Sequence, residues 1–288
     1  MEFSNLFVQF LHGIVYAMLL FMVSSGLTLV FGMLGVLNFA HGSLYMIGAY
    51  VGLSTVLLTQ SFWVSLFVAP ILVALLGGFL ETCFLRKTYT RGHVHQLMLT
   101  YGLAYILDEL TKMIWGTESH SINVPPILQG SVFIMENAYP VYRLAIIIFG
   151  ASLALGVWLL LKKTRLGMII RAAVFSTDLV KFLGFNQPLL FRGVFAFGAA
   201  LAALGGVFAS PLITTYPGMG ADIIIDAFIV VIVGGLGSLP GALFGSLLIG
   251  QVMSLGILFL PRFALVFSYV LMAIILIIRP TGILGEKE

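Results

Sequence analysis

The stretch Phe10-Leu-His-Gly-Ile-Val-Tyr-Ala-Met-Leu-Leu-Phe-Met-Val-Ser-Ser-Gly-Leu-Thr-Leu-Val-Phe31 is an apolar run without any Asp, Glu, Lys or Arg. A helix that crosses a bilayer needs roughly 20 mainly apolar residues, so this run predicts a first membrane span. The glycine-rich segment Gly32-Met-Leu-Gly-Val-Leu-Asn-Phe-Ala-His-Gly42 follows directly. It predicts an interruption of the helix at that point.

Similar apolar segments continue to the end of the chain. They cover 43–58, 62–85, 95–115, 141–161, 189–212, 223–233, 242–258 and 263–278. Of the 288 residues, 60% are hydrophobic and 9% are charged, whereas soluble domains are about half apolar and about a quarter charged. The sequence therefore predicts an all-α, polytopic membrane protein with about eight or nine transmembrane helices, forming a single transmembrane domain over residues 1–288.

Basic residues gather in the gaps at 86–91, 162–192 and 279–287, while the gap at 118–136 is acidic. Cytoplasmic loops carry an excess of Lys and Arg, so we expect the basic gaps to face the cytoplasm and the acidic gap to face outward. This places the N-terminus outside. Nine crossings fit better than eight, because only then does the C-terminus lie in the cytoplasm; Arg143 and Arg262 are exceptions to the scheme. The net charge of +3 is thereby explained without a nucleic-acid partner.

The glycine-rich segment has a second copy later in the chain. Its positions Gly32, Leu34, Gly35, Leu37 and Ala40 align with Gly234, Leu236, Gly237, Leu239 and Ala242, and Ile47-Gly48 aligns with Ile249-Gly250. This echo predicts two broken helices that arose from an internal repeat. Paired breaks of this kind indicate a translocation path between the two halves of a transporter.

The polar and glycine residues of the two breaks are the candidates for that path. Unpaired backbone groups survive within a membrane only where protein or water surrounds them, and a polar side chain inside a span is a functional candidate. Two alternatives stay open: the glycines only allow close helix packing, or Asn38 and His41 satisfy the freed backbone groups of their own break. The candidates are Gly35, Asn38, His41, Ser43, Gly237, Ser238 and Pro240.

Two pairs of charged residues are spaced i,i+4 and so share a helix face. Asp222 and Asp226 lie near the outer end of a span, where they could attract a substrate ammonium group or simply face solvent. Asp108 and Lys112 are expected to form a structural pair.

The loop at about 162–187 is too polar to span the membrane. Within it, residues 167–184 predict one short amphipathic helix, with Ile170 and Val174 on its apolar side and Gly184 as its C-cap. Such a helix could lie in the membrane interface or dock into a groove of a soluble partner. Its position on the basic side favours docking, for which the candidate residues are Arg171, Asp178, Lys181, Phe182 and Gly184.

Signals for chemistry within this chain are absent. The sequence has no G-x-x-x-x-G-K-[ST] phosphate loop, its five histidines are scattered, and Cys83 is its single cysteine. No G-x-S-x-G elbow supports Ser-His-Asp catalysis. We therefore expect no catalytic residues, no metal and no cofactor in this chain, which is predicted not to be an enzyme.

Three segments, in order along the chain, resemble one known family. Gly26-Leu-Thr-Leu-Val-Phe-Gly-Met-Leu-Gly-Val-Leu-Asn-Phe-Ala-His-Gly-Ser43 resembles the first block of the branched-chain amino acid ABC transporter permeases of the LivH type. Thr164-Arg-Leu-Gly-Met-Ile-Ile-Arg-Ala172, with Phe182-Leu-Gly-Phe-Asn186, resembles their ATPase-coupling loop. Val233-Gly-Gly-Leu-Gly-Ser-Leu-Pro-Gly-Ala-Leu-Phe-Gly245 resembles their late glycine block.

The resemblance implies a permease subunit of an ATP-binding cassette importer in the bacterial cytoplasmic membrane. Such a subunit pairs with a second, similar permease; two ATPase subunits dock below, and a periplasmic binding protein delivers branched-chain or other hydrophobic amino acids. The family also includes carriers of urea and short amides. Val174-Phe-Ser-Thr-Asp178 departs from the more polar run usual in the coupling loop. A self-sufficient channel or secondary carrier is the alternative, and a scaffold without transport is a weaker one.

Overall fold

The computed structural model describes residues 3–134 and 137–285, and these fold almost entirely into helices. The eleven α-helices are α1 (Phe3–Leu34), α2 (Ala40–Thr59), α3 (Phe62–Cys83), α4 (His93–Trp115), α5 (Val141–Lys163), α6 (Arg165–Phe175), α7 (Thr177–Phe182), α8 (Gln187–Ala209), α9 (Met219–Gly234), α10 (Leu239–Phe259) and α11 (Ala264–Ile278). Short 3₁₀ turns are η1 (Leu85–Thr88), η2 (Pro126–Leu128) and η3 (Pro261–Phe263). The predicted all-α class is confirmed.

The one sheet in the described part of the chain is a small hairpin. Strands β1 (Ser131–Ile134) and β2 (Asn137–Pro140) pair antiparallel, with Ser131 opposite Pro140. The hairpin lies in the acidic gap between α4 and α5.

Within the described residues, seven helical segments are long and apolar enough to cross a membrane. They are α1, α2, α3 with η1, α5, α8, α10 and η3 with α11. The sequence also predicted spans at α4 and α9. Helix α4 has 23 residues and carries Asp108, Glu109 and Lys112 in its last third, while α9 has only 16 residues. The Lys112 Nζ atom forms ion pairs with both carboxylates, at 2.8 Å from Asp108 and 2.7 Å from Glu109, so the predicted Asp108–Lys112 pair is confirmed.

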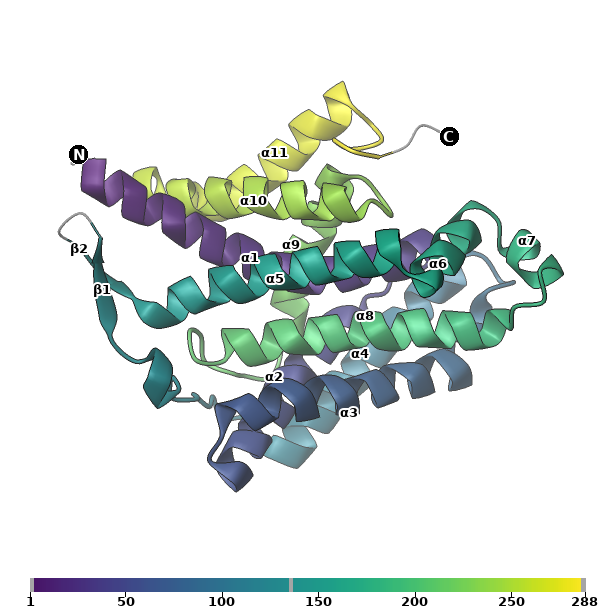
Figure 1. Cartoon of the computed structure of the whole chain (residues 1–288), viewed down its shortest axis with the longest axis horizontal. Helices are drawn as coiled ribbons and strands as arrows, with labels where there is room; N and C mark the ends of the chain where they lie inside the picture. The colour runs from purple at the N-terminus through teal and green to yellow at the C-terminus, as the bar shows by residue number, and fades with distance from the viewer. Residues whose placement is uncertain (1–2, 135–136, 286–288) are drawn as a thin grey trace.

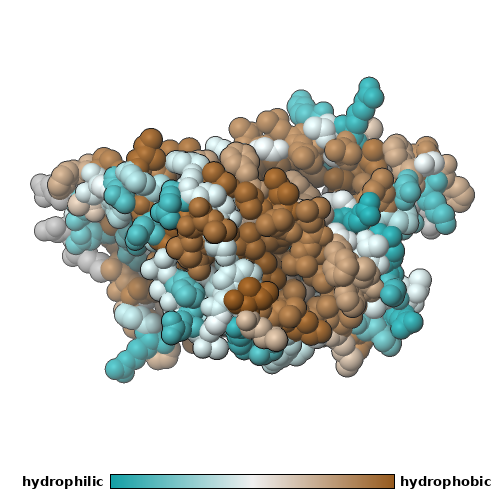
Figure 2. Space-filling model, turned by 90° about the horizontal axis from the view of Figure 1, so that it is seen from below, coloured by the Kyte–Doolittle hydropathy of each residue, from teal (hydrophilic) through white to brown (hydrophobic). Residues whose placement is uncertain are grey.

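The long helices lie roughly along one axis, with the N-terminus and the hairpin at one end and α6 and α7 at the other (Figure 1). Helices α1 and α10 run antiparallel, because Gln9 bonds the Ser254 carbonyl near one end and Gly32 packs against Gly237 near the other. Figure 2 shows apolar residues across the middle of one face, with hydrophilic residues gathered toward the two ends. This distribution matches a protein whose middle lies in lipid.

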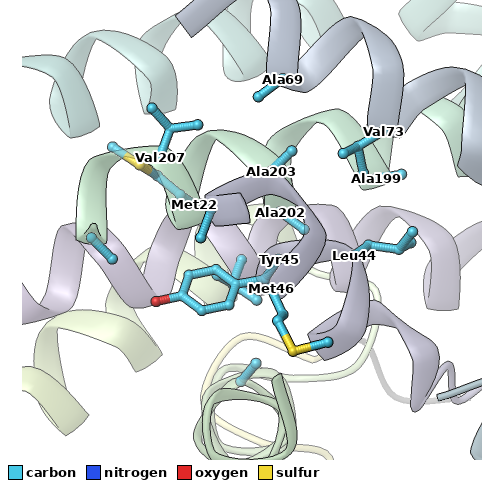
Figure 3. Close-up of a cluster of buried hydrophobic side chains, with 14 of the residues drawn as sticks. Met22, Leu44, Tyr45, Met46, Ala69, Val73, Ala199, Ala202, Ala203 and Val207 are labelled. Carbon is cyan, nitrogen blue, oxygen red and sulfur yellow. The ribbon is translucent and has the colours of Figure 1, made fainter. Parts of the chain in front are cut away.

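The centre of the core lies where α8 packs between α2 and α3 (Figure 3). Helix α8 contributes small side chains there, and Ala199, Ala202 and Ala203 are fully buried. They face larger residues of α1 and α2, including Met22 and Tyr45 (Figure 3). Small residues let helix backbones approach closely, which favours helix association in lipid.

Both glycine-rich breaks separate two helices at corresponding positions. The first joins α1 to α2 and the second joins α9 to α10. The aligned glycines Gly35 and Gly237 both have a positive φ, 65° and 78° respectively. Only glycine adopts this backbone region without steric cost, which explains why both copies have glycine there.

Candidate translocation and coupling site

The first break ends α1 at Leu34 and starts α2 at Ala40. Three of its backbone groups have partners: the Gly35 N–H donates to Phe31, the Leu37 carbonyl accepts from the Thr100 hydroxyl at 3.2 Å, and the Asn38 carbonyl accepts from the His41 N–H. Neighbouring helix α4 therefore stabilises the break. Buried backbone groups need such partners in a membrane.

Helix α2 begins deep inside the bundle. The His41 Nε2 atom lies 3.0 Å from the Val23 carbonyl oxygen, and the His41 ring also lies against Gly26. Gly26 and Val23 precede the end of α1 at Leu34 by eight and eleven residues, which is roughly 12–17 Å along the helix. Residues 35–39 therefore fold back along α1. Helix α2 starts at the level of Val23 and Gly26, not at the C-terminal end of α1.

The first turn of α9 meets the first turn of α2 at this depth. A Cβ on Gly42 would overlap the Gly220 carbonyl oxygen, and a Cβ on Gly220 would lie 2.6 Å from the Gly42 carbonyl oxygen. Phe39 also packs against Phe228 of α9, with 4.8 Å between the ring centroids and an angle of 53° between the ring planes. Helix N-termini carry partial positive charge and unpaired N–H groups, so two of them converge inside the bundle.

Asn38 lies immediately before this junction with an unused side chain. It is 0% exposed, and neither its Oδ1 nor its Nδ2 has a hydrogen-bond partner among the described residues. Buried polar groups are nearly always hydrogen-bonded. The Asn38 amide is therefore a buried donor and acceptor without a partner in the described part of the chain.

The other candidates of the first break have protein partners. His41 is fully buried and bonds Val23, so it connects the start of α2 to α1, although its Nδ1 has no partner in the described part. The Ser43 hydroxyl donates to the Ala104 carbonyl of α4 at 3.3 Å. These bonds position the start of α2. They run to neighbouring helices and not to the freed groups of the break itself.

The second break lies closer to the C-terminal end of α1 than the start of α2 does. Gly237 packs against Gly32, near the C-terminal end of α1. The Ser238 hydroxyl caps α10 by accepting the Gly241 N–H at 3.1 Å, and Pro240 occupies the first turn. The Leu284 N–H donates to the Gly234 carbonyl and so closes the end of α9. Gly35, Gly237, Ser238 and Pro240 therefore lie nearer the end of α1, while Asn38, His41 and Ser43 lie deeper.

Helix α9 also carries two Tyr–Asp hydrogen bonds. The Tyr16 hydroxyl donates to Asp226 and the Tyr216 hydroxyl donates to Asp222, each at 2.6 Å. The bond to Asp222 raises the pKa of Tyr216, in the loop before α9, to about 12. The sequence analysis identified the two aspartates but missed both tyrosines. Both tyrosines lie outside α9, so no helical spacing relates them to the aspartates.

The loop at 162–187 forms two helices, whereas the sequence predicted one. Helix α6 ends at Phe175, Ser176 is extended with φ −159°, and α7 begins at Thr177. Ser, Thr and Asp favour helix starts, and the run Ser176-Thr-Asp178 provides such a start. Gly184 has φ +82°, and the Phe185 N–H donates to the Val180 carbonyl, so the predicted C-cap is confirmed.

Helix α7 lies beyond the ends of the long helices (Figure 1), and it carries the coupling candidates Asp178, Lys181 and Phe182. Phe182 is 87% exposed and its neighbour Leu183 is 72% exposed. Lys181 and Arg171 are also exposed, and Arg171 donates to the Leu161 carbonyl at the end of α5. For Asp178 the structure describes the backbone alone, within α7.

A buried ion pair that the sequence analysis missed lies at the base of this loop. The fully buried Glu81 carboxylate accepts from Arg86 at 2.6 Å and 3.1 Å, and from Tyr89 at 3.1 Å. Arg86 also donates to the Pro188 carbonyl at the start of α8, at 2.9 Å. The signal was a lone acidic residue inside the apolar run 62–85, because charges within spans are rare and paired.

Among the described residues, seven apolar helical segments are long enough to cross a bilayer, and this bundle defines a multi-pass membrane protein. The family model described as branched-chain amino acid transport system, permease component, matches residues 9–278. The chain belongs to this family.

Its relatives cover all or nearly all of its length. It is 28% identical to the high-affinity branched-chain amino acid transport system permease protein BraD of Pseudomonas aeruginosa, over 100% of this chain and 98% of BraD. It is also 28% identical to LivH of Escherichia coli strain K12, with the same coverage, and to a probable LivH of Methanocaldococcus jannaschii, over 95% of this chain and 90% of that protein. Among solved structures, PsaBC from Streptococcus pneumoniae in complex with Fab shares the fold, with a TM-score of 0.52 and 15% identity over 94% of this chain and 91% of that one.

Proposed function

We propose that this chain is one permease subunit of an ATP-driven importer in the bacterial cytoplasmic membrane. Its cargo is branched-chain or other hydrophobic amino acids, because its relatives are permease proteins of such systems. The observation that carries the proposal is the convergence of the α2 and α9 N-termini inside the bundle, beside the unused amide of Asn38. The basic gaps favour the orientation with α6 and α7 in the cytoplasm.

The chemistry of the junction suits a zwitterionic solute with an apolar side chain. Helix N-termini favour a carboxylate, and the Asn38 amide can both donate and accept. Asp222 is exposed in the first turn of α9, where its charge attracts an ammonium group. His41 and Ser43 support the path by positioning α2, while Gly35, Gly237, Ser238 and Pro240 shape its inner end.

The partners we propose are a second, homologous permease, two ATP-binding cassette ATPase subunits and a periplasmic substrate-binding protein. The exposed Phe182 and Leu183 beyond the bundle support a docking role for α7, since large apolar side chains at a polar end indicate an interaction site. Arg171 of α6 and Lys181 of α7 add charge for recognition, while Asp178 lies in α7 and Gly184 follows it. ATP hydrolysis is assigned to the separate ATPase chains.

The first experiment is purification from native membranes followed by mass spectrometry. We expect ATPase subunits and a second permease to co-purify, and the ligand of the associated binding protein to identify the cargo. Uptake is then measured in proteoliposomes with and without ATP. Recovery of the chain alone, with ATP-independent uptake, would contradict the proposal.

Charge reversal separates an importer from a self-sufficient channel or secondary carrier. Arg171→Glu combined with Lys181→Glu is expected to abolish ATP-driven uptake, while folding and membrane insertion persist because both side chains are exposed. Arg262→Glu is the control, because it reverses an exposed charge beyond the far end of α10. A carrier would keep full uptake in the double variant, and a scaffold would show no flux in any variant.

A further inference from the structure

An apolar groove opens on the bundle beside the loop at 162–187, which we call the coupling segment. Its volume is about 370 Å³, within the range of roughly 300–1,000 Å³ typical of small-molecule sites. Leu29 of α1, Leu161 of α5, Ile169 of α6 and Leu190 of α8 contribute to its walls. The groove therefore lies between α6 and three helices of the bundle, α1, α5 and α8.

The walls offer almost no hydrogen-bonding capacity. Asn186 is the one polar side chain among the lining residues, and its Oδ1 already accepts the Leu189 N–H at 3.1 Å to cap α8. An extended peptide segment placed here would bury backbone N–H and C=O groups without partners, which is costly. A hydrocarbon chain has no such groups and suits these walls.

Cations border the groove. Lys162 follows Leu161 in the last turn of α5, and Arg165 lies one turn before Ile169 on α6. Arg171 reaches the carbonyl of the lining residue Leu161. Residues 162–171, which carry these three cations, have four Lys or Arg and no Asp or Glu, so this side of the groove is positively charged.

An apolar groove with a positive rim matches an amphiphile with an anionic head. We propose that this groove binds an anionic glycerophospholipid, with an acyl chain between α5, α6 and α8 and the phosphate beside Lys162, Arg165 and Arg171. Basic pockets between transmembrane helices on the cytoplasmic side bind lipid head groups in this way. The inference goes beyond the transport proposed above and does not depend on the cargo.

Two matched glycines provide the test. Gly193 lines the groove on α8, and an added Cβ there meets no atom within 4 Å, so Gly193→Leu fills the groove without a clash at its base. Gly156 on α5 is also exposed and equally free of contacts, but it does not line the groove, so Gly156→Leu is the control.

The measurement is native mass spectrometry of the purified assembly with added phosphatidylglycerol or phosphatidylcholine of identical acyl chains. We expect phosphatidylglycerol to be retained at least tenfold better, Gly193→Leu to lose this retention and Gly156→Leu to keep it. Lys162→Gln with Arg165→Gln should remove the preference between the two lipids. Equal retention of both lipids by the unmodified chain, or equal retention by the two leucine variants, overturns the proposal.

A second measurement covers the case in which Gly193→Leu does not fold. Gly193→Cys is introduced into a chain whose single cysteine, Cys83, is replaced by Ser, and maleimide labelling is timed. Phosphatidylglycerol should slow labelling several-fold more than phosphatidylcholine. Equal rates, or protection that appears only when ATPase subunits are added, would show that a lipid is not the occupant.

Discussion

Removal of Arg86 tests whether the buried Glu81 pair stabilises the end of the bundle that carries α6 and α7. Arg86→Met would leave the fully buried Glu81 carboxylate with hydrogen bonds from Tyr89 and Thr82 but without its cation. Breaking a buried ion pair on one side costs about 3–5 kcal/mol. Because the Arg86 side chain is 33% exposed, water can partly replace it, and we expect about 3 kcal/mol, which is roughly a hundredfold in the unfolding equilibrium.

The assay is denaturant titration of the purified chain in detergent, followed by helical circular dichroism. Lys112→Met is the matched control, because Lys112 is as exposed as Arg86 but its carboxylate partners Asp108 and Glu109 are 22% and 63% exposed, whereas Glu81 is fully buried. Water can solvate these two carboxylates once the cation is removed, and ion pairs that water reaches contribute little. Adding Glu81→Gln to Arg86→Met should restore most of the lost stability, since no buried charge remains. If Arg86→Met shifts the midpoint no more than Lys112→Met does, the argument for a stabilising buried pair is refuted.

The remaining predictions concern the path and its supporting contacts. Asn38→Leu should reduce uptake at least tenfold while leaving thermal stability unchanged or raised, because the amide makes no hydrogen bond in the described structure; a loss of stability equal to the loss of uptake would argue for a structural role. Gly42→Ala should destabilise the chain by about 1–3 kcal/mol through overlap with Gly220, whereas Gly102→Ala, on open helix surface, should be neutral or stabilising; similar melting temperatures for the two would contradict the close approach. Ser238→Ala should lower the free energy of unfolding by about 1 kcal/mol, because it removes the cap of α10. The same denaturant titration measures this change, and Ser238→Gly is expected to lower the free energy of unfolding by less.

Several features of the fold were predictable because they depend on neighbouring residues. Apolar runs of sufficient length predict helices in lipid wherever they occur, and all nine expected segments are helical. Gly184 ends α7 with a positive φ, and Asn186 caps α8 with Pro188 in its first turn, as their local chemistry indicates. The division of the coupling segment at Ser176 was missed, because amphipathic periodicity outweighed the helix-start signal of the residues that follow it.

The sequence alone determined that this chain lies in a membrane, that its helices break at two related glycine segments, and that a basic, partly apolar loop extends from one end. Hydropathy and glycine conformation are local properties, so these conclusions required no contact between distant residues. Only the tertiary structure decided the depth at which α2 begins, the meeting of Gly42 with Gly220, and the pairing of Glu81 with Arg86 against Pro188. The Gly42–Gly220 contact and the Arg86–Pro188 hydrogen bond join segments far apart in the chain, and the burial of Glu81 depends on the helices packed around it. No pattern among neighbouring residues specifies such contacts, so the sequence alone could not predict them.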